Sequence, residues 1–492
     1  MSIPTRASRI RRWLVGTGVL VVVLGSSAGL WAASLLPDTY SMTSMGYADY
    51  GGGTQPQAVA GSHSHAQDGV DLSTLVPAPD RPADVRVDLV ARAERVTLAG
   101  VPPFDGFTLN GTTPGPTIRA RAGELVEVHA TNQNVTDGMT LHWHGVDLPN
   151  AMDGVAGVTQ DAIAPGERFV YRFIAQEGTY WYHSHQVSHP QVSGGLLGAL
   201  VVDAATPDPR VVDVTALVHA YAGTRTVNGK PGGFAHPARP GDTARVRVIN
   251  TDSGPMPVWV SGASYRVVAV DGRALNRPGQ LTGEALVVTA GGRADLEVVV
   301  PTGGARVEFA GASVSLGDSE APHSPAPRVL VDLLSYGSPG PTIQTPGQPD
   351  RTFEYRIGRR LGLLDGRPGS WWTINGGLYP NVPMFMVRTG ERVRFLVSNE
   401  SGEVHPMHLH GHHLLVVARD GVRATGSPWL VDSLNVEPGE TYELQMVADN
   451  PGIWMDHCHN LPHAREGLMT HVAYEGYRST HVVGGDHGNS PE

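Results

Sequence analysis

The chain has 492 residues, a formal net charge of -11 and a single cysteine, Cys458. This length predicts about three domains, at roughly 150 residues each. The negative charge, with no basic stripe beyond the N-terminus, argues against nucleic acid as a partner. Abundant Gly and Pro, with short Val-rich runs between turn signals, predict an all-β protein.

The first 36 residues are predicted to be a targeting segment. Four arginines (Arg6, Arg9, Arg11 and Arg12) precede an apolar run from Trp13 to Leu36, which is long enough to span a bilayer. We therefore expect an extracytoplasmic protein, either secreted or anchored to the outer face of the cytoplasmic membrane. The sequence leaves open whether the segment is a cleaved signal peptide or a retained membrane anchor. It also leaves open whether export is by the Sec or the twin-arginine route.

Composition also predicts where the chain lacks a packed core. Residues 37–82 are rich in Gly, Ser, Gln and Pro without a sustained apolar period, which predicts a flexible linker. A second Pro- and Gly-rich stretch, 337–350, is predicted to be an interdomain linker. The Gly-rich residues 481–492 are predicted to form a tail.

One pattern occurs three times after the first linker. In each copy a Gly and an Asn nine residues apart frame an alternating strand: Gly123 to Asn132, Gly241 to Asn250 and Gly390 to Asn399. Another glycine, and then a turn that leads into a second alternating strand, follow in the same order. The repeat predicts three copies of one small β-sandwich or barrel domain, over residues 83–204, 205–336 and 351–480.

Histidines cluster in the outer copies. Four pairs are separated by one residue each: His142 and His144, His183 and His185, His408 and His410, and His457 and His459. On a strand this spacing places both side chains on one face, where two imidazoles can reach one metal or two neighbouring metals. The middle copy has Trp259 and Ser261 at the corresponding place, so we expect the first and third domains to build the site together.

Cys458 lies between two of these histidines, and His463 follows five residues later. A thiolate with two imidazoles is typical of a blue copper site, and His405 is the best donor of the second imidazole. Clustered imidazoles select zinc, copper, iron or nickel, and the thiolate favours copper. A closed structural zinc site is a minor alternative, because it would use only four of these ligands.

The four clusters, in this order and spacing, resemble the copper-binding motifs of the multicopper oxidases, the family of laccases, bilirubin oxidases and bacterial copper-efflux oxidases. The resemblance covers residues 85–476 and implies three cupredoxin-like Greek-key domains. It implies four coppers per chain. The type 1 copper would be held by His405, Cys458 and His463, the type 2 copper by His142 and His408, and the type 3 pair by His144, His183, His185, His410, His457 and His459.

The resemblance implies an oxidase that couples four one-electron oxidations of a donor to the reduction of dioxygen to two waters. Cys458 would link the type 1 copper to the cluster through its bonded neighbours His457 and His459. Laccase-like oxidation of phenols or aromatic amines is the leading expectation, and oxidation of Cu(I) or another metal ion in copper resistance is the alternative. A copper-binding or electron-transfer protein without oxidase turnover is the alternative from another class. No partner chain is required, and we expect a monomer.

Three further positions bear on mechanism. Asp153, eleven residues after His142, resembles the family's acidic residue near the trinuclear cluster and is the candidate proton relay; its alternative role is that of a turn-forming Asp before Gly. Leu468 stands where many bacterial members have an axial methionine, which predicts a three-coordinate type 1 copper with a raised potential. Ala464 stands where several bacterial relatives have Glu, which puts a second carboxylate relay in doubt.

Overall fold

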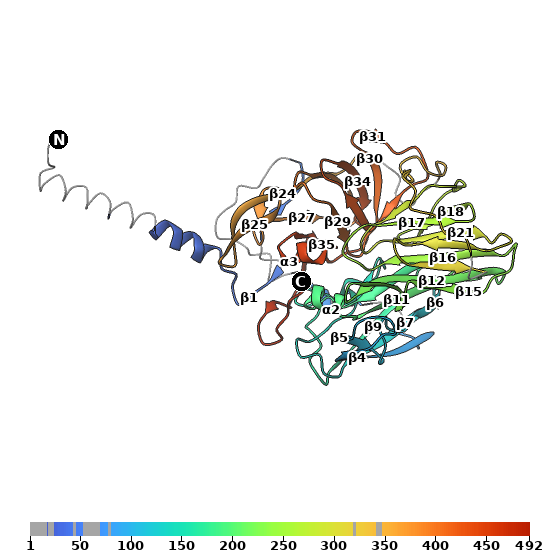
Figure 1. Ribbon diagram of the computed structural model, residues 1–492. Helices are drawn as coiled ribbons and strands as arrows, with labels where there is room; N and C mark the ends of the chain where they lie inside the picture. The colour runs from blue at the N-terminus through green and yellow to red at the C-terminus, as the bar shows by residue number, and fades with distance from the viewer. Residues whose placement is uncertain are drawn as a thin grey trace, which may run out of the picture.

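The computed structural model describes residues 17, 24–42, 46–52, 69–76, 80–317, 321–340 and 347–492. Almost all regular structure in these ranges is β, in three pairs of large sheets that meet at a common junction, with two further two-stranded sheets (Figure 1). The predicted all-β class is confirmed. Within the described ranges, no helix combines the length and apolar character needed to cross a membrane.

The first domain is a sandwich of two four-stranded sheets. One has the order β5 (Phe104–Leu109), β4 (Val85–Val96), β7 (Leu125–Asn132), β9 (Arg168–Ile174). The other has the order β6 (Ile118–Arg121), β11 (Leu197–Asp203), β10 (Gly178–His183), β8 (His142–His144). The 3-10 helix η4 (Asn150–Met152) and the short helix α2 (Ser188–Ser193) lie in its loops.

The second domain follows with a seven-stranded and a five-stranded sheet. The larger has the order β14 (Lys230–Pro231), β13 (Thr224–Val227), β12 (Val211–Tyr221), β16 (Thr243–Asn250), β21 (Arg293–Val299), β18 (Tyr265–Val270), β19 (Arg273–Ala274). The smaller has the order β15 (Gly233–His236), β23 (Ser313–Leu316), β22 (Ala305–Glu308), β17 (Met256–Ser261), β20 (Leu286–Val288).

The third domain has an eight-stranded and a six-stranded sheet. The larger has the order β26 (Gly377–Leu378), β25 (Arg367–Ile374), β24 (Arg351–Leu364), β28 (Arg392–Asn399), β34 (Thr441–Val447), β30 (Leu414–Arg419), β31 (Val422–Arg423), with β32 (Leu430–Val431) paired to β30. The smaller has the order β2 (Tyr47–Asp49), β27 (Pro383–Val387), β36 (Met469–Tyr474), β35 (Ile453–Cys458), β29 (His405–Leu409), β33 (Ser433–Val436). The helix α3 (Leu461–Arg465) follows β35.

The threefold sequence repeat corresponds to the same strand pairing and the same buried asparagine in each domain. In each domain the repeated strand (β7, β16 or β28) pairs in parallel with the first strand of its domain. The asparagine that ends it is buried, and its side-chain amide donates to two or more backbone carbonyls of the following loops, as Asn132 does to Val135 and Ile163. Buried carbonyls without partners would be costly, so the repeated Asn stabilises the loops that lead toward the histidine clusters.

The predicted flexible linker, 37–82, differs from expectation where the structure describes it. β1 (Thr39–Tyr40) pairs with β38 (Val483–Gly484), β2 adds to the edge of a third-domain sheet, and β3 (Val70–Asp71) pairs with β37 (Tyr477–Arg478) before the 3-10 helix η3 (Leu72–Thr74). Unpaired strand edges offer hydrogen bonds to any extended segment, irrespective of its composition. These parts of the linker are therefore built into the third domain.

The expected tail, 481–492, also packs rather than projects. β38 lies within it, and the chain continues to Glu492, whose side chain is only 3% exposed. Figure 1 shows the end of the chain near α2 and α3, at the middle of the molecule, whereas residues 24–33 form a helix that projects away from it.

Candidate metal centre

Two strand pairs carry the histidine clusters to the junction of the first and third domains. In the first domain β8 pairs with β10, which places His142 opposite His183. In the third domain β29 pairs with β35, which places His408 opposite His457. Rings from the two domains stack on each other, His142 on His410 with centres 3.8 Å apart and His144 on His408 with centres 3.6 Å apart. Eight histidines from the four pairs thus meet in one place, each at most 1% exposed.

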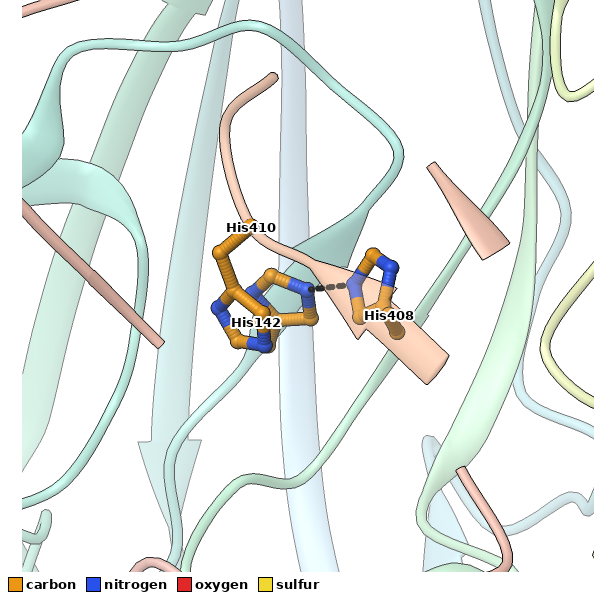
Figure 2. Close-up of side chains that lie close together, drawn as sticks. All are labelled: His142, His408 and His410. Carbon is orange, nitrogen blue, oxygen red and sulfur yellow. Dashed lines mark hydrogen bonds between the residues drawn. The ribbon is translucent and has the colours of Figure 1, made fainter. Parts of the chain in front are cut away.

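The ring nitrogens of this eight-histidine cluster converge in overlapping groups of three. Within each group the nitrogens lie within 4.8 Å of one another: His142 with His408 and His410, His142 with His144 and His183, and His185 with His410 and His457. Figure 2 shows the first group, in which the Nε2 atoms of His142 and His408 face each other at 3.4 Å. His459 lies beside the second group, with its ring centre 4.9 Å from that of His144.

The cluster fits a group of metal ions that accept nitrogen ligands. Burial, and the charge of neighbouring imidazoles, lower the pKa of His183, His410 and His459 well below the ordinary value, so these rings are neutral and offer lone pairs. His144 Nδ1, His183 Nε2 and both ring nitrogens of His459 are buried without a hydrogen-bond partner among the described residues. Because such atoms are costly to leave unpaired, the arrangement is that of a ligand set.

Asp153 lies directly behind two of these histidines. Its carboxylate is 3.0 Å from His410 Nδ1 and 3.2 Å from His142 Nδ1, and its backbone carbonyl is 2.9 Å from His142 Nδ1. Acceptors at Nδ1 fix the tautomer that leaves Nε2 free to bind a metal. Asp153 is 1% exposed, so it does more than form the turn before Gly154.

A second carboxylate, Asp432, supports the opposite side of the cluster. It lies 3.3 Å from His144 Nε2, and its carbonyl is 2.9 Å from His408 Nδ1. Arg293 of β21 donates to both carboxylate oxygens, at 2.6 and 2.5 Å. Burial alone would raise the pKa of Asp432, but the Arg293 guanidinium outweighs it and holds the pKa well below the ordinary value. Asp432 is therefore an ionised acceptor.

The middle domain thus contributes to the centre without supplying a ligand. Besides Arg293, the backbone of Gly291 touches two ligand candidates, since a Cβ atom there would lie 2.8 Å from His144 and 2.9 Å from His459. Gly145 is restricted in the same way, because its Cβ would lie 2.0 Å from the Arg293 guanidinium. No sequence motif marks Asp432 or Arg293, and only the packing of the three domains reveals them.

A smaller group lies within the third domain alone. Cys458 Sγ is 3.7 Å from His405 Nδ1 and 3.8 Å from His463 Nδ1, and the two nitrogens are 3.2 Å apart. Burial and the neighbouring His463 lower the pKa of His405 to about 3, while burial raises the pKa of the Cys458 thiol. A buried thiol becomes a thiolate when a metal cation binds it. The three predicted donors therefore form one trigonal set.

The position beside this set belongs to leucine. Leu468 is fully buried in the same apolar cluster as Cys458, and its carbonyl accepts from the Cys458 backbone N–H at 3.1 Å. Met469 packs in a different apolar cluster, with Met42 and Met455. This placement agrees with the alternation expected for neighbouring residues of an extended chain.

The outer side of the trigonal set is close to solvent. The side chain of His463 is 12% exposed, and the Trp372 ring lies 4.4 Å from it, centre to centre. Trp372 donates to Glu466 at 2.8 Å, and the Arg359 guanidinium lies over its ring at 4.5 Å. His463 is therefore the member of the trigonal set that solvent reaches.

The β-sandwich domains, the buried imidazole cluster and the thiolate set together define a copper-dependent oxidoreductase. Family models described as multicopper oxidase match residues 91–207 and 354–476. The chain belongs to the multicopper oxidase family, whose members use dioxygen as acceptor, and the expected cupredoxin-like fold is confirmed.

Two sequence relatives and one solved structure support this assignment. Multicopper oxidase MmcO of Mycobacterium tuberculosis is 29% identical over 460 residues, which cover 79% of this chain and 87% of the relative. Laccase-1 of Botryotinia fuckeliana is 30% identical over 437 residues, covering 74% and 77%. The crystal structure of a multi-copper oxidase from Pseudomonas Thermotolerans aligns with a TM-score of 0.64 and 28% identity, covering 79% of this chain and 98% of that one.

Proposed function

We propose that this protein is a laccase-like oxidase, which takes single electrons from a phenol or aromatic amine and delivers four of them to dioxygen, forming two waters. The observation that carries the proposal is the position of Cys458. Its side chain belongs to the trigonal set, while its neighbours His457 and His459 belong to the buried cluster. One covalent segment therefore joins the site that receives electrons to the site that uses them.

The ligand assignment follows the groups of donors. His405, Cys458 and His463 would hold the type 1 copper, and His142 and His408 the type 2 copper. The type 3 pair would be held by the remaining six histidines: His144, His183, His185, His410, His457 and His459. Copper supplies reversible one-electron chemistry in such sites.

The chain's own residues set the conditions for that chemistry. Burial keeps water away from the cluster, and Asp153 and Asp432 hold ligand rings in the tautomers that bind metal. Asp153 is the proposed proton relay, because it is the carboxylate in contact with both His142 and His410.

The surroundings of His463 support an organic donor. The accessible edge of the trigonal set is bordered by Trp372, Arg359 and Glu403, of which Glu403 is 48% exposed and lies 3.7 Å from His463 Nε2. Met384 and Met386, candidates for thioether contacts to Cu(I), pack in the separate cluster with Met42. A Cu(I)-oxidising site would need thioethers beside its copper, whereas these methionines pack with Met455 and Met469 in an apolar cluster that does not include Cys458.

The test is dioxygen uptake by the copper-loaded full-length protein, with a phenolic donor and Cu(I) compared side by side. Faster uptake with the phenol is expected. A clear preference for Cu(I) would make the protein a metallo-oxidase, and no uptake with either donor, from a blue protein with about four coppers, would leave only electron transfer. The strands β1 to β3 must be kept, because they pair with the third domain.

We further propose that residues 1–36 deliver the protein across the cytoplasmic membrane. Arginines followed by an apolar run support this, as do the exposed apolar side chains of Leu24, Leu30 and Trp31. N-terminal sequencing of the protein from fractionated cells would test it. Soluble extracytoplasmic protein that lacks this segment indicates cleavage, membrane-bound protein that retains it indicates an anchor, and protein found in the cytoplasm contradicts the proposal.

A further inference from the structure

The last residues of the sequence reach the eight-histidine cluster. Glu492 Oε1 lies 3.1 Å from His457 Nδ1 and 3.9 Å from His185 Nε2. The backbone carbonyl of Pro491 lies 3.1 Å from His185 Nδ1. The Nε2 atoms of His185 and His457 face each other at 3.3 Å, on the side where the type 3 ligands converge.

The carboxylate and its histidine neighbour are buried polar groups that match each other. Both oxygens of Glu492 and Nδ1 of His457 lack a hydrogen bond of good geometry within the described part of the chain. A buried carboxylate without a partner is costly, whereas an imidazole Nδ1–H at 3.1 Å is a suitable donor for it. Glu492 is therefore placed to accept from His457.

The segment that carries Glu492 is held in place by specific bonds. We call residues 488–492 the strap. Its Ser490 accepts from the Val187 backbone N–H at 2.6 Å and donates its own N–H to the Gln186 side chain at 2.8 Å. Gln186 also donates to the Gly488 carbonyl at 2.9 Å, and Asn489 accepts from the Ala162 N–H at 2.8 Å. The strap is thus attached to the first-domain loop that carries His185.

The strap completes a pattern seen elsewhere in the cluster. Asp153 accepts from His142 and His410, and Asp432 contacts His144 and His408. Of the other four histidines, His185 and His457 have their acceptors in the strap.

We propose that the strap is part of the metal centre: Pro491 and Glu492 hold His185 and His457 in the tautomer and orientation that binds copper. Glu492 is a positioning residue in this role, because it acts through His457. The proposal rests on the copper assignment of the proposed function.

The test measures how firmly the non-blue copper is held. In the full chain, Glu492→Leu fills the space without an acceptor and Glu492→Gln keeps an acceptor oxygen. Asp486→Ala, which removes an exposed carboxylate shortly before the strap, is the control. Total copper minus blue copper is followed during titration with EDTA. For Glu492→Leu, the EDTA concentration that removes half of the non-blue copper is expected to fall about 10- to 100-fold.

The blue absorption of each variant shows that the third domain has folded around its trigonal set. Glu492→Gln is expected to hold more copper than Glu492→Leu, and Asp486→Ala to match the unmutated protein. Wild-type resistance in Glu492→Leu, or a glutamine variant no better than leucine, would overturn the proposal. Failure of the proposed function is distinguishable, because the unmutated protein would then lack the blue absorption or bind fewer than about four coppers.

Discussion

The two metal centres differ in how they are built. The trigonal set of His405, Cys458 and His463 comes from one domain, with one ligand 12% exposed. The eight-histidine cluster lies between two domains, is fully buried, and is supported by Asp153, Asp432 and residues of the strap. A site that accepts electrons must be reached by its donor, whereas a site that reduces dioxygen must retain its intermediates. The first needs only one folded domain, and the second needs the assembled molecule.

The largest effect is expected from a substitution that disables the trigonal set and leaves the eight-histidine cluster intact. Cys458→Ser removes the thiolate and leaves all eight cluster histidines unchanged. We expect the blue absorption and donor oxidation to fall to background while the non-blue copper stays bound, as measured by absorption, copper content and dioxygen uptake. Retained turnover with the donor would refute the assignment of the electron entry site.

The next largest effect is expected from a substitution that acts on the eight-histidine cluster alone. Asp153→Asn keeps the shape of the side chain but loses the charge shared by His142 and His410. Turnover is expected to fall about 10- to 100-fold, with blue absorption unchanged. The exposed Asp137 in the same domain supplies the control, Asp137→Asn. Steady-state oxygen uptake checks the prediction, and an Asp153→Asn protein as fast as the control would exclude Asp153 from the relay.

Contacts at the junction between domains are expected to make the stability of the protein depend on pH. The trigonal set, which lies within one domain, should not share this dependence. His413 Nδ1 lies 3.0 Å from Asp147 of the first domain, and its Nε2 lies 3.0 Å from the Asp271 carbonyl of the second. Burial lowers the pKa of His413, but the carboxylates of Asp147 and Asp432 together outweigh burial and raise the pKa to about 9. This stabilisation is complete below the unfolded pKa of about 6.5 and is lost as the pH rises through about 9.

The contribution is at most about 3 kcal/mol, from roughly 1.4 kcal/mol per pKa unit. His413→Gln should therefore lower the thermal unfolding midpoint at pH of about 6, and the difference should shrink by pH of about 9.5. His323→Gln, at a side chain that is 65% exposed, is the control. A His413→Gln destabilisation that is equal at both pH values would contradict the role of its charge.

The smallest effect tunes the trigonal set without breaking it. Leu468→Met offers a thioether at the residue whose carbonyl accepts from the Cys458 backbone N–H, and the reduction potential of the blue site is expected to fall relative to the unmutated protein. Leu461→Met, a buried leucine in another apolar cluster, is the control for added methionine. Redox titration of the blue absorption measures both variants, and an unchanged or higher potential in Leu468→Met would contradict a vacant axial position.

Sequence patterns predicted the parts of this structure that are encoded locally. Alternation and turns predicted the strands, and the Gly-to-Asn repeat predicted three domains because each copy needs the same buried Asn. The spacing of one residue between paired histidines predicted that they share a face. Composition wrongly predicted a flexible linker where strands pair with distant segments. Residues 39–40 and 47–49 join sheets whose edge strands lie hundreds of residues away in the sequence.

The sequence by itself determined the kind of chemistry, because a lone Cys between two histidines restricts the ligands whatever surrounds them. Only the tertiary structure decided which groups support those ligands. Arg293 lies 139 residues from Asp432, and Glu492 lies 35 residues from His457. No local pattern can report such contacts, because they depend on how three separately encoded domains and the strap pack together.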